Sequence, residues 1–253
     1  MRENASHDRK VVETAMAAGE IMLLSGSEIS RVEDTMNRIL NMAHSSTQTA
    51  FVLTTGLMLT LDGQEELITV SRRVPERSTN LHRIYLVNNV SRDLSNGKID
   101  IDRAYWELGR IKNILQFTVF SRCLAYVGAA LFFTMLLGGK GIDCLLAGVM
   151  GGAIALIQYS ICGFGFNSFF LNGISAMVVA MIGIVFKKYI LPDIEIDSII
   201  IGGIMPLVPG VIFTTAIRDT LNGDYHSGMS RILEAIVVAL AIAVGVAMAY
   251  VIL

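Results

Sequence analysis

The chain has 253 residues and a formal net charge of −2, and its charged residues are concentrated in the first half. Residues 1–112 contain 14 Lys/Arg and 15 Asp/Glu, whereas residues 113–253 contain 6 and 7. The second half holds apolar runs long enough for the roughly 20-residue helices that cross a bilayer, which excludes a purely soluble globular protein. Because the net charge is −2 and the second half has no basic cluster beyond Lys187 and Lys188, the sequence also lacks the charge pattern of a nucleic-acid-binding protein.

The cysteines and the N-terminus bear on the cellular compartment. Cys123, Cys144 and Cys162 all fall in apolar runs and lack the paired spacing of a zinc or redox site, so we expect them to pack as small hydrophobic side chains. Residues 1–10 are polar and are not followed by the apolar segment of a secretory signal. We therefore expect residues 1–112 to stay in the cytoplasm.

The first predicted elements are two helices. Apolar residues at helical spacing indicate an amphipathic helix from Val11 to Leu24, which Gly26 ends. The segment Ser30–Glu33 fits a capping box and predicts the start of a second helix, with Ser27 as the other candidate N-cap. The Ser-Gly-Ser sequence between them is therefore predicted to be a helix-to-helix turn.

The apolar period then changes to near 2 between Thr49 and Asp62, which is typical of strands. We predict strands at about 47–55 and 57–62, separated by Gly56. A third strand at 67–70 is expected to pair back in the antiparallel direction, because Asp62 and Gly63 form a turn signal.

Two further helices are predicted after this sheet. The first follows Pro75 and ends at Asn96-Gly97, and the second starts at Asp100. Residues 1–112 are thus predicted to form an α+β domain, a small antiparallel sheet with helices, that is large enough to have its own core.

We find no catalytic or metal-binding motif in this domain. Ser25 or Ser27 beside His44 would be the only imaginable nucleophile and base, but the domain has no nucleophile elbow, no metal-spaced histidine cluster and no phosphate loop. We therefore expect neither an enzyme nor a cofactor. Arg72, Arg73, Arg77 and Arg83 form a local basic group. It is either a solvated face or a site for an anionic ligand or lipid headgroups.

Residues 113–253 are predicted to form an all-α bundle of five transmembrane helices. The predicted spans are 117–138, 142–162, 168–186, 199–217 and 232–253. The short connections between them favour tightly packed hairpins, and small residues such as those in Gly148–Gly152 and Gly202-Gly203 permit close approach. An odd number of spans places the termini on opposite sides. The charged N-terminal domain without an export signal favours N-terminus in and C-terminus out, whereas the count of positive loop residues decides little.

Polar residues within or between the spans are candidates for a substrate path, because lipid admits such groups mainly toward an interior or a cavity. Arg122 lies within the first span and either reaches the cytoplasmic headgroups or lines the path. Gln158, Asn167 and Asn172 flank the second loop and either line a polar path or lie at the interface. Asp219 directly follows Arg218, and we interpret the two as a charge pair at the membrane surface.

The fourth span contains the sharpest signal. Pro206 and Pro209, followed by Gly210, remove two backbone donors and predict a break at membrane depth. Transporters use such broken helices at their substrate sites. The alternative is a plain proline kink.

The same break predicts further substrate contacts. The missing proline donors are expected to free carbonyl groups near residues 202 and 205. Thr214 and Thr215, about one turn further on, would add hydroxyl groups.

Several of these segments together resemble the bacterial threonine/serine exporter family. They are Ala18–Glu33, the strands around Phe51 to Leu61, the segment Arg72 to Leu81, and Pro206–Gly210. The resemblance covers nearly the whole chain. It implies efflux of small polar metabolites across the bacterial inner membrane, either threonine and serine or C4 dicarboxylates such as succinate. It also implies the larger subunit of a split exporter, which a small multi-span membrane protein would complete; a homo-oligomer is the other expected assembly.

The residues by themselves leave two interpretations of the function, a transporter and a sensor. The first is a secondary exporter subunit in contact with membrane lipid and driven by an ion gradient, since no nucleotide-binding loop is present. The second is a membrane-tethered sensor whose cytoplasmic domain binds a ligand. A tether needs only one or two spans, which favours the exporter. A membrane-bound hydrolase is the third and weakest alternative.

Overall fold

The computed structural model describes residues 2–44, 47–62, 67–74, 78–114, 117–161 and 168–253. These residues form two compact units. Unit 1 comprises Met1–Gln116 and Val211–Ile232, and unit 2 comprises Phe117–Gly210 and Leu233–Leu253. Residues 211–232, which the sequence assigned to the membrane bundle, thus cluster with the N-terminal residues.

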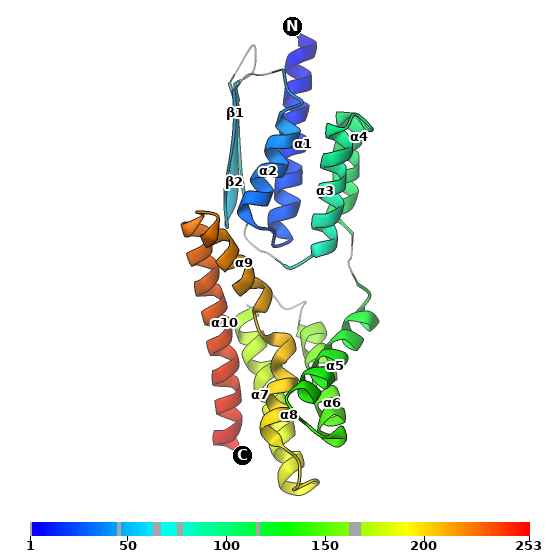
Figure 1. The fold of residues 1–253 in the computed structure, drawn as a ribbon, viewed down its shortest axis with the longest axis vertical. Coiled ribbons are helices and arrows are strands. Elements are labelled where there is room, and N and C mark those ends of the chain that lie inside the picture. Colours follow the sequence, from blue (N-terminus) through cyan, green and yellow to red (C-terminus); the bar gives the residue numbers. More distant parts are fainter. Residues whose placement is uncertain (1, 45–46, 63–66, 75–77, 115–116, 162–167) are drawn as a thin grey trace. The chain divides into compact units, whose positions relative to one another are not determined.

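Four helices and one sheet form the N-terminal part of unit 1. The helices are α1 (Arg2–Leu24), α2 (Ile29–Leu40), α3 (Leu81–Ser95) and α4 (Ile101–Lys112). Helix α1 begins earlier than predicted, and the other three were predicted from their periodicity. In Figure 1, α1 and α2 lie between the sheet on one side and α3 and α4 on the other, and the contacts between these elements agree. The core therefore lies on both faces of the α1–α2 layer.

The sheet has three antiparallel strands in the order β1, β2, β3. Their bounds are Thr47–Leu53, Gly56–Asp62 and Leu67–Arg73. In the register, Leu59 of β2 stands opposite Ala50 and Val70. Leu57, Leu59 and Leu61 are buried whereas Met58 is exposed, as the period of 2 requires. The predicted α+β fold and the antiparallel third strand are confirmed.

The start of α2 differs from the prediction. Its N-cap is Glu28, whose side chain makes no capping hydrogen bond, and Ser30 lies inside the first turn. The Glu33 carboxylate does not reach back to the helix start; it accepts the backbone N–H of Val52 in β1 at 3.1 Å. The capping-box prediction was therefore wrong, because a strand N–H competes for the same carboxylate. The predicted start of α4 is confirmed, since Asp100 accepts the N–H of Arg103 at 2.7 Å.

The apolar helices are α5 (Val119–Leu136), α6 (Gly141–Ile161), α7 (Ser168–Tyr189) and α10 (Tyr225–Ile252). Among the described residues, these four are long and apolar enough to cross a membrane. A fifth span results if α8 (Ile196–Ile204), the 3₁₀ turn η1 (Met205–Leu207) and α9 (Gly210–Leu221) count as one interrupted span. The prediction of a multi-pass helical region is thus confirmed, with four or five apolar helices.

Within unit 2, α6 contacts α5, α7 and α8 (Figure 1). Glycines set the helix spacing. A Cβ at Gly151 would overlap the carbonyl oxygen of Tyr126 in α5, and one at Gly202 would overlap the Thr134 side chain. Such close backbone approach replaces the hydrophobic driving force that is missing between helices in lipid.

Candidate functional site

The backbone is interrupted where the two prolines predict it. Helix α8 ends at Ile204, Pro206 lies in the 3₁₀ turn, and Val208 is extended with φ −63° and ψ 130° before α9 begins at Gly210. A proline lacks the N–H that continues a helix and disfavours helical geometry in the residue before it. The segment is therefore a true interruption and not a continuous kinked helix.

The carbonyl groups that the sequence predicted to be free are occupied. The N–H of Met205 donates to the carbonyl oxygen of Gly202, and the N–H of Val208 donates to that of Met205 at 3.1 Å. These i to i+3 bonds are the usual way in which a tightened last turn satisfies its carbonyls. The expectation of free carbonyls at 202 and 205 was therefore wrong.

The residues that follow the break have local partners. Thr214 donates its hydroxyl to the carbonyl oxygen of Val211 at 3.1 Å, and Thr215 donates to the same oxygen at 2.8 Å. Each hydroxyl retains lone pairs that can accept a hydrogen bond. A Cβ at Gly210 would meet no atom within 4 Å, so packing does not require glycine there. The role of these three residues in a substrate path stays a prediction.

An apolar groove of about 490 Å³ lies beside the break within unit 2. Val208 and Pro209 line it together with residues of α8 and α10. The remaining lining residues are also apolar: Ile200, Ile201, Ile204, Ala239, Ile242, Ala243, Val246 and Ala247. This side of the break therefore offers no polar group to a metabolite.

A second cavity, of about 220 Å³, lies between α5 and α6 and contains polar groups. It is lined by Val119, Arg122, Cys123, Tyr126, Ala155, Gln158 and Tyr159. The Gln158 side-chain amide donates to the Asn172 amide oxygen in α7 at 3.2 Å. Three of the predicted polar residues, Arg122, Gln158 and Asn172, are thus grouped together. Asn167 lies outside the described residues.

The two tyrosines of this cavity were not among the predicted site residues. In α5, Tyr126 lies one turn after Arg122, and in α6, Tyr159 directly follows Gln158. The i and i+4 spacing of Arg122 and Tyr126 was the available signal. Arg122 is the only cation among the lining residues, so it determines the charge that this cavity favours.

A buried ion pair in unit 1 was interpreted wrongly from the sequence. Asp219 in α9 and Arg231 in α10 are 0% and 3% exposed, and Arg231 Nε lies 3.1 Å from Asp219 Oδ2. Asp219 is therefore not a surface partner of Arg218. The Arg218 side chain instead pairs with Glu28. A hairpin turn at Asn222-Gly223 between two oppositely charged helix positions was the signal that could have revealed this pair.

This ion pair connects α9 and α10 to the joint between α1 and α2. Asp219 Oδ1 accepts the N–H of Ile29 at 3.1 Å, and Arg231 Nη2 donates to the carbonyl oxygen of Ser27 at 2.7 Å. The Asn222 amide adds a hydrogen bond to the Ser30 hydroxyl at 3.0 Å. The Ser-Gly-Ser joint is therefore held by residues about 190 positions further along the chain.

The basic group expected around Arg72 is not one free surface. Arg72 and Lys112 both bind the Glu20 carboxylate, at 2.6 and 2.8 Å. Burial by itself raises the pKa of Glu20, but the hydrogen bonds from Lys112 and Arg72 outweigh it and hold the pKa below the ordinary 4.5. Arg83 donates to the carbonyl oxygen of Ile114 at 3.0 Å, and Arg77 lies outside the described residues.

Comparison with known proteins gives one family. The ThrE family model, which describes a threonine/serine exporter, matches residues 13–253. A curated protein of Mycobacterium tuberculosis, named "Probable threonine/serine exporter", is 23% identical over 245 residues. The alignment covers 95% of this chain but 46% of that protein, so the chain spans about half the length of the curated relative. No solved structure matches the chain. Because the family match covers nearly all of its residues, the chain belongs to the threonine/serine exporter family.

Proposed function

We propose that this membrane exporter carries hydroxylated amino acids of the threonine and serine class out of the cytoplasm. The observation that carries the proposal is the cavity between α5 and α6, which places Arg122 and Gln158 between two predominantly apolar helices. Its volume of about 220 Å³ lies below the roughly 300–1,000 Å³ of sites for drug-sized ligands. The cavity therefore suits a small metabolite.

The chemistry of the lining favours a substrate with one carboxylate. The Arg122 guanidinium is a planar fork of donors that pairs with a carboxylate through two hydrogen bonds. Gln158 and the two tyrosines supply neutral groups for an ammonium or a hydroxyl. A C4 dicarboxylate would need a second cation, which the lining residues do not provide. We therefore place threonine and serine ahead of succinate.

We propose that transport runs from the cytoplasm, where the N-terminal domain lies, across the bacterial inner membrane. An ion gradient drives it. The relative that matches is about twice as long as this chain. We infer that a second, small multi-span membrane protein completes the transporter, and that a homo-oligomer is the alternative. Affinity purification of the tagged chain in mild detergent tests this assembly. A monomer that exports by itself in liposomes would exclude it.

The transport proposal is tested by efflux from vesicles that contain the purified chain with any co-purifying subunit. Vesicles are loaded with labelled threonine, serine or succinate at equal concentration. We expect threonine and serine to leave faster than succinate, and Arg122→Gln to slow their efflux by removing the only cation of the cavity.

The matched control is Lys140→Gln, which removes an exposed cation from the loop before α6. It is expected to transport at the wild-type rate. Equal efflux by the Arg122→Gln variant and the wild type, in samples with the same amount of folded protein, would place the substrate path elsewhere. Faster efflux of succinate would overturn the choice of substrate class.

A further inference from the structure

The single tryptophan of the chain, Trp106, lies on the outer face of α4. Its side chain is about half exposed. The guanidinium groups of Arg103 and Arg110 lie 4.6 and 4.9 Å from the centre of its ring. These distances are within the range of cation–π attraction. Trp106 and the two arginines therefore form an ordered group of one aromatic ring and two cations on a solvent-accessible helix face.

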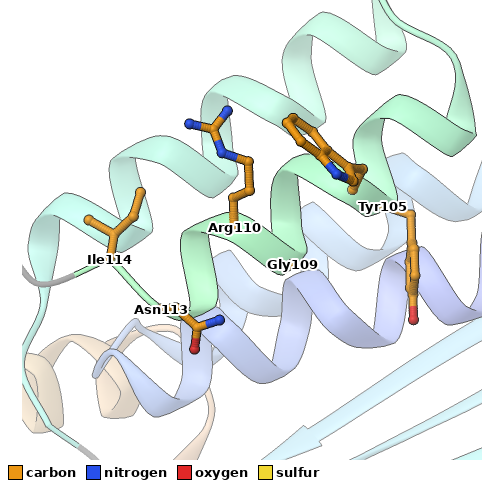
Figure 2. Close-up of a pocket in the computed structure, with 6 residues that line it drawn as sticks. Tyr105, Gly109, Arg110, Asn113 and Ile114 are labelled. Atoms are coloured by element: carbon orange, nitrogen blue, oxygen red, sulfur yellow. The ribbon is translucent and has the colours of Figure 1, made fainter.

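A shallow hollow of about 570 Å³ lies on the same helix. Figure 2 shows Arg110 leaving α4 on one side and Tyr105 and Asn113 on the other, with Gly109 between them. A Cβ at Gly109 would meet no atom within 4 Å, so the glycine leaves the floor of the hollow open. Tyr105 is also about half exposed. Two large aromatic side chains thus stand uncovered on one helix whose opposite face is buried.

The positive charges on this face outnumber the negative charges. Glu107 pairs with Arg103 at 2.8 Å and with Arg110 at 3.2 Å, and Asp102 pairs with Lys10. One carboxylate therefore serves two arginines, which leaves one positive charge in excess. Because Glu107 and the indole ring hold both guanidinium groups in place, the arginines lose little conformational entropy when they bind a further anion.

The Trp106 face of α4 lies close in sequence to the first apolar helix, and this limits what can bind to it. Val119, the first residue of α5, follows Ile114 by five positions in the chain, and five extended residue steps reach at most about 18 Å. Trp106 lies eight residues before Ile114, which is about 12 Å along a helix. The first apolar helix therefore tethers this face within reach of the membrane interface, a region that favours tryptophan, tyrosine and arginine.

We propose that the Trp106 face of α4 binds the headgroups of anionic phospholipids at the cytoplasmic surface of the membrane. The indole and phenol rings lie among the headgroups with their polar atoms toward water. Arg103 and Arg110 pair with lipid phosphates, to which a guanidinium donates two hydrogen bonds. This contact holds the outer face of α4 at the lipid headgroups.

The experiment uses Trp106 as its own reporter in the full-length protein. The chain is reconstituted in nanodiscs of phosphatidylcholine alone and of phosphatidylcholine with phosphatidylglycerol. Fluorescence is quenched in turn by acrylamide from water and by lipids that carry a spin label at the headgroup. With phosphatidylglycerol present, we expect a blue-shifted emission, strong quenching by the labelled lipid and at least twofold weaker quenching by acrylamide.

The double variant Arg103→Gln, Arg110→Gln retains the fluorophore and is expected to lose the difference between the two lipid compositions. Arg92→Gln, which removes an exposed cation from α3, is the matched control and should behave as the wild type. Quenching by acrylamide alone in both lipids would overturn the proposal. So would a Trp106 that neither quencher reaches, because that result indicates a protein partner or a second copy on this face.

Discussion

The carboxylate of Asp219, in α9, accepts the backbone N–H of Ile29, the first residue of α2, at 3.1 Å. The first N–H groups of a helix have no partner within it, and its N-terminus attracts negative charge. No side chain near Ile29 in the sequence caps α2. Asp219 takes this role across 190 positions while it pairs with Arg231. Folding of the N-terminal residues is thereby linked to the helix that follows the proline break.

The first prediction concerns this ion pair. Asp219→Ala leaves the buried Arg231 without its carboxylate and α2 without its cap, and should lower the free energy of unfolding by about 3–5 kcal/mol. Arg218→Gln is the matched control, since it breaks a partly exposed pair with Glu28 that is worth at most about 1 kcal/mol. Denaturant unfolding of the full chain in detergent, followed by Trp106 fluorescence, measures both. Equal losses in the two variants would mean that burial of the Asp219 pair has no energetic consequence.

The second prediction concerns glycine packing between α5 and α8. In Gly202→Ala the added Cβ would lie 2.7 Å from the backbone nitrogen of Thr134, which side-chain movement cannot relieve. We expect overpacking to cost about 1–3 kcal/mol and to lower the melting temperature. Gly128→Ala in α5 is the control, because its Cβ meets no atom within 4 Å. If both variants melt at the wild-type temperature, α5 and α8 do not pack as closely as described.

The third prediction compares two glutamates whose pKa values shift in opposite directions. Burial raises the pKa of Glu33 above the ordinary 4.5, and the Val52 N–H only partly offsets this. The folded state then binds the proton more tightly than the unfolded state, so Glu33 lowers stability as the pH rises above 4.5. Glu20, whose pKa is lowered by Lys112 and Arg72, stabilises the fold above 4.5 and loses this effect as the pH falls below it.

We therefore expect Glu33→Gln to raise the melting temperature at pH 7 and Glu20→Gln to lower it. The effect of Glu33→Gln should shrink as the pH falls toward 4.5, whereas that of Glu20→Gln should shrink only below 4.5. Thermal unfolding of both variants and the wild type between pH 3.5, about one unit below the ordinary glutamate pKa, and pH 7.5 gives the comparison. Shifts of the same sign at pH 7 would contradict it.

The fourth prediction tests the break itself. Replacing Pro206 and Pro209 by Ala restores two backbone donors, so that a continuous helix no longer carries the cost of about 3 kcal/mol or more that proline has in a helix interior. We expect a more stable protein with a continuous helix and without efflux. The vesicle assay, with equal amounts of folded protein, measures the flux. Wild-type flux with unchanged selectivity would show that the break serves packing alone. The substrate would then bind elsewhere, and Arg122 and Gln158 would be the next residues to test.

Thr214→Val belongs to the same assay. The hydroxyl already donates to the carbonyl of Val211, so the loss on substitution should be mild and should appear in apparent substrate affinity. A complete loss of transport with folded protein would indicate a direct role for Thr214 that its present hydrogen bond does not suggest.

Much of the architecture follows from local sequence. The apolar helices were predictable because a helix in lipid must satisfy its own backbone groups, so length and composition are sufficient signals. The interruption at Pro206 and Pro209 was predictable because a missing N–H is a property of the residue itself. The alternation of Leu57, Met58 and Leu59 likewise determined which face of β2 is buried.

Only the tertiary structure determined which polar side chains and backbone groups form hydrogen bonds with one another. Glu33 had a local capping role available and instead binds the N–H of Val52, while Asp219 supplies the cap from α9. The pairing of Gln158 with Asn172 joins α6 to α7 in the same way. A carboxylate or an amide binds whichever donor the fold brings within about 3 Å. Sequence patterns record spacing along one element, whereas these contacts depend on how separate elements pack.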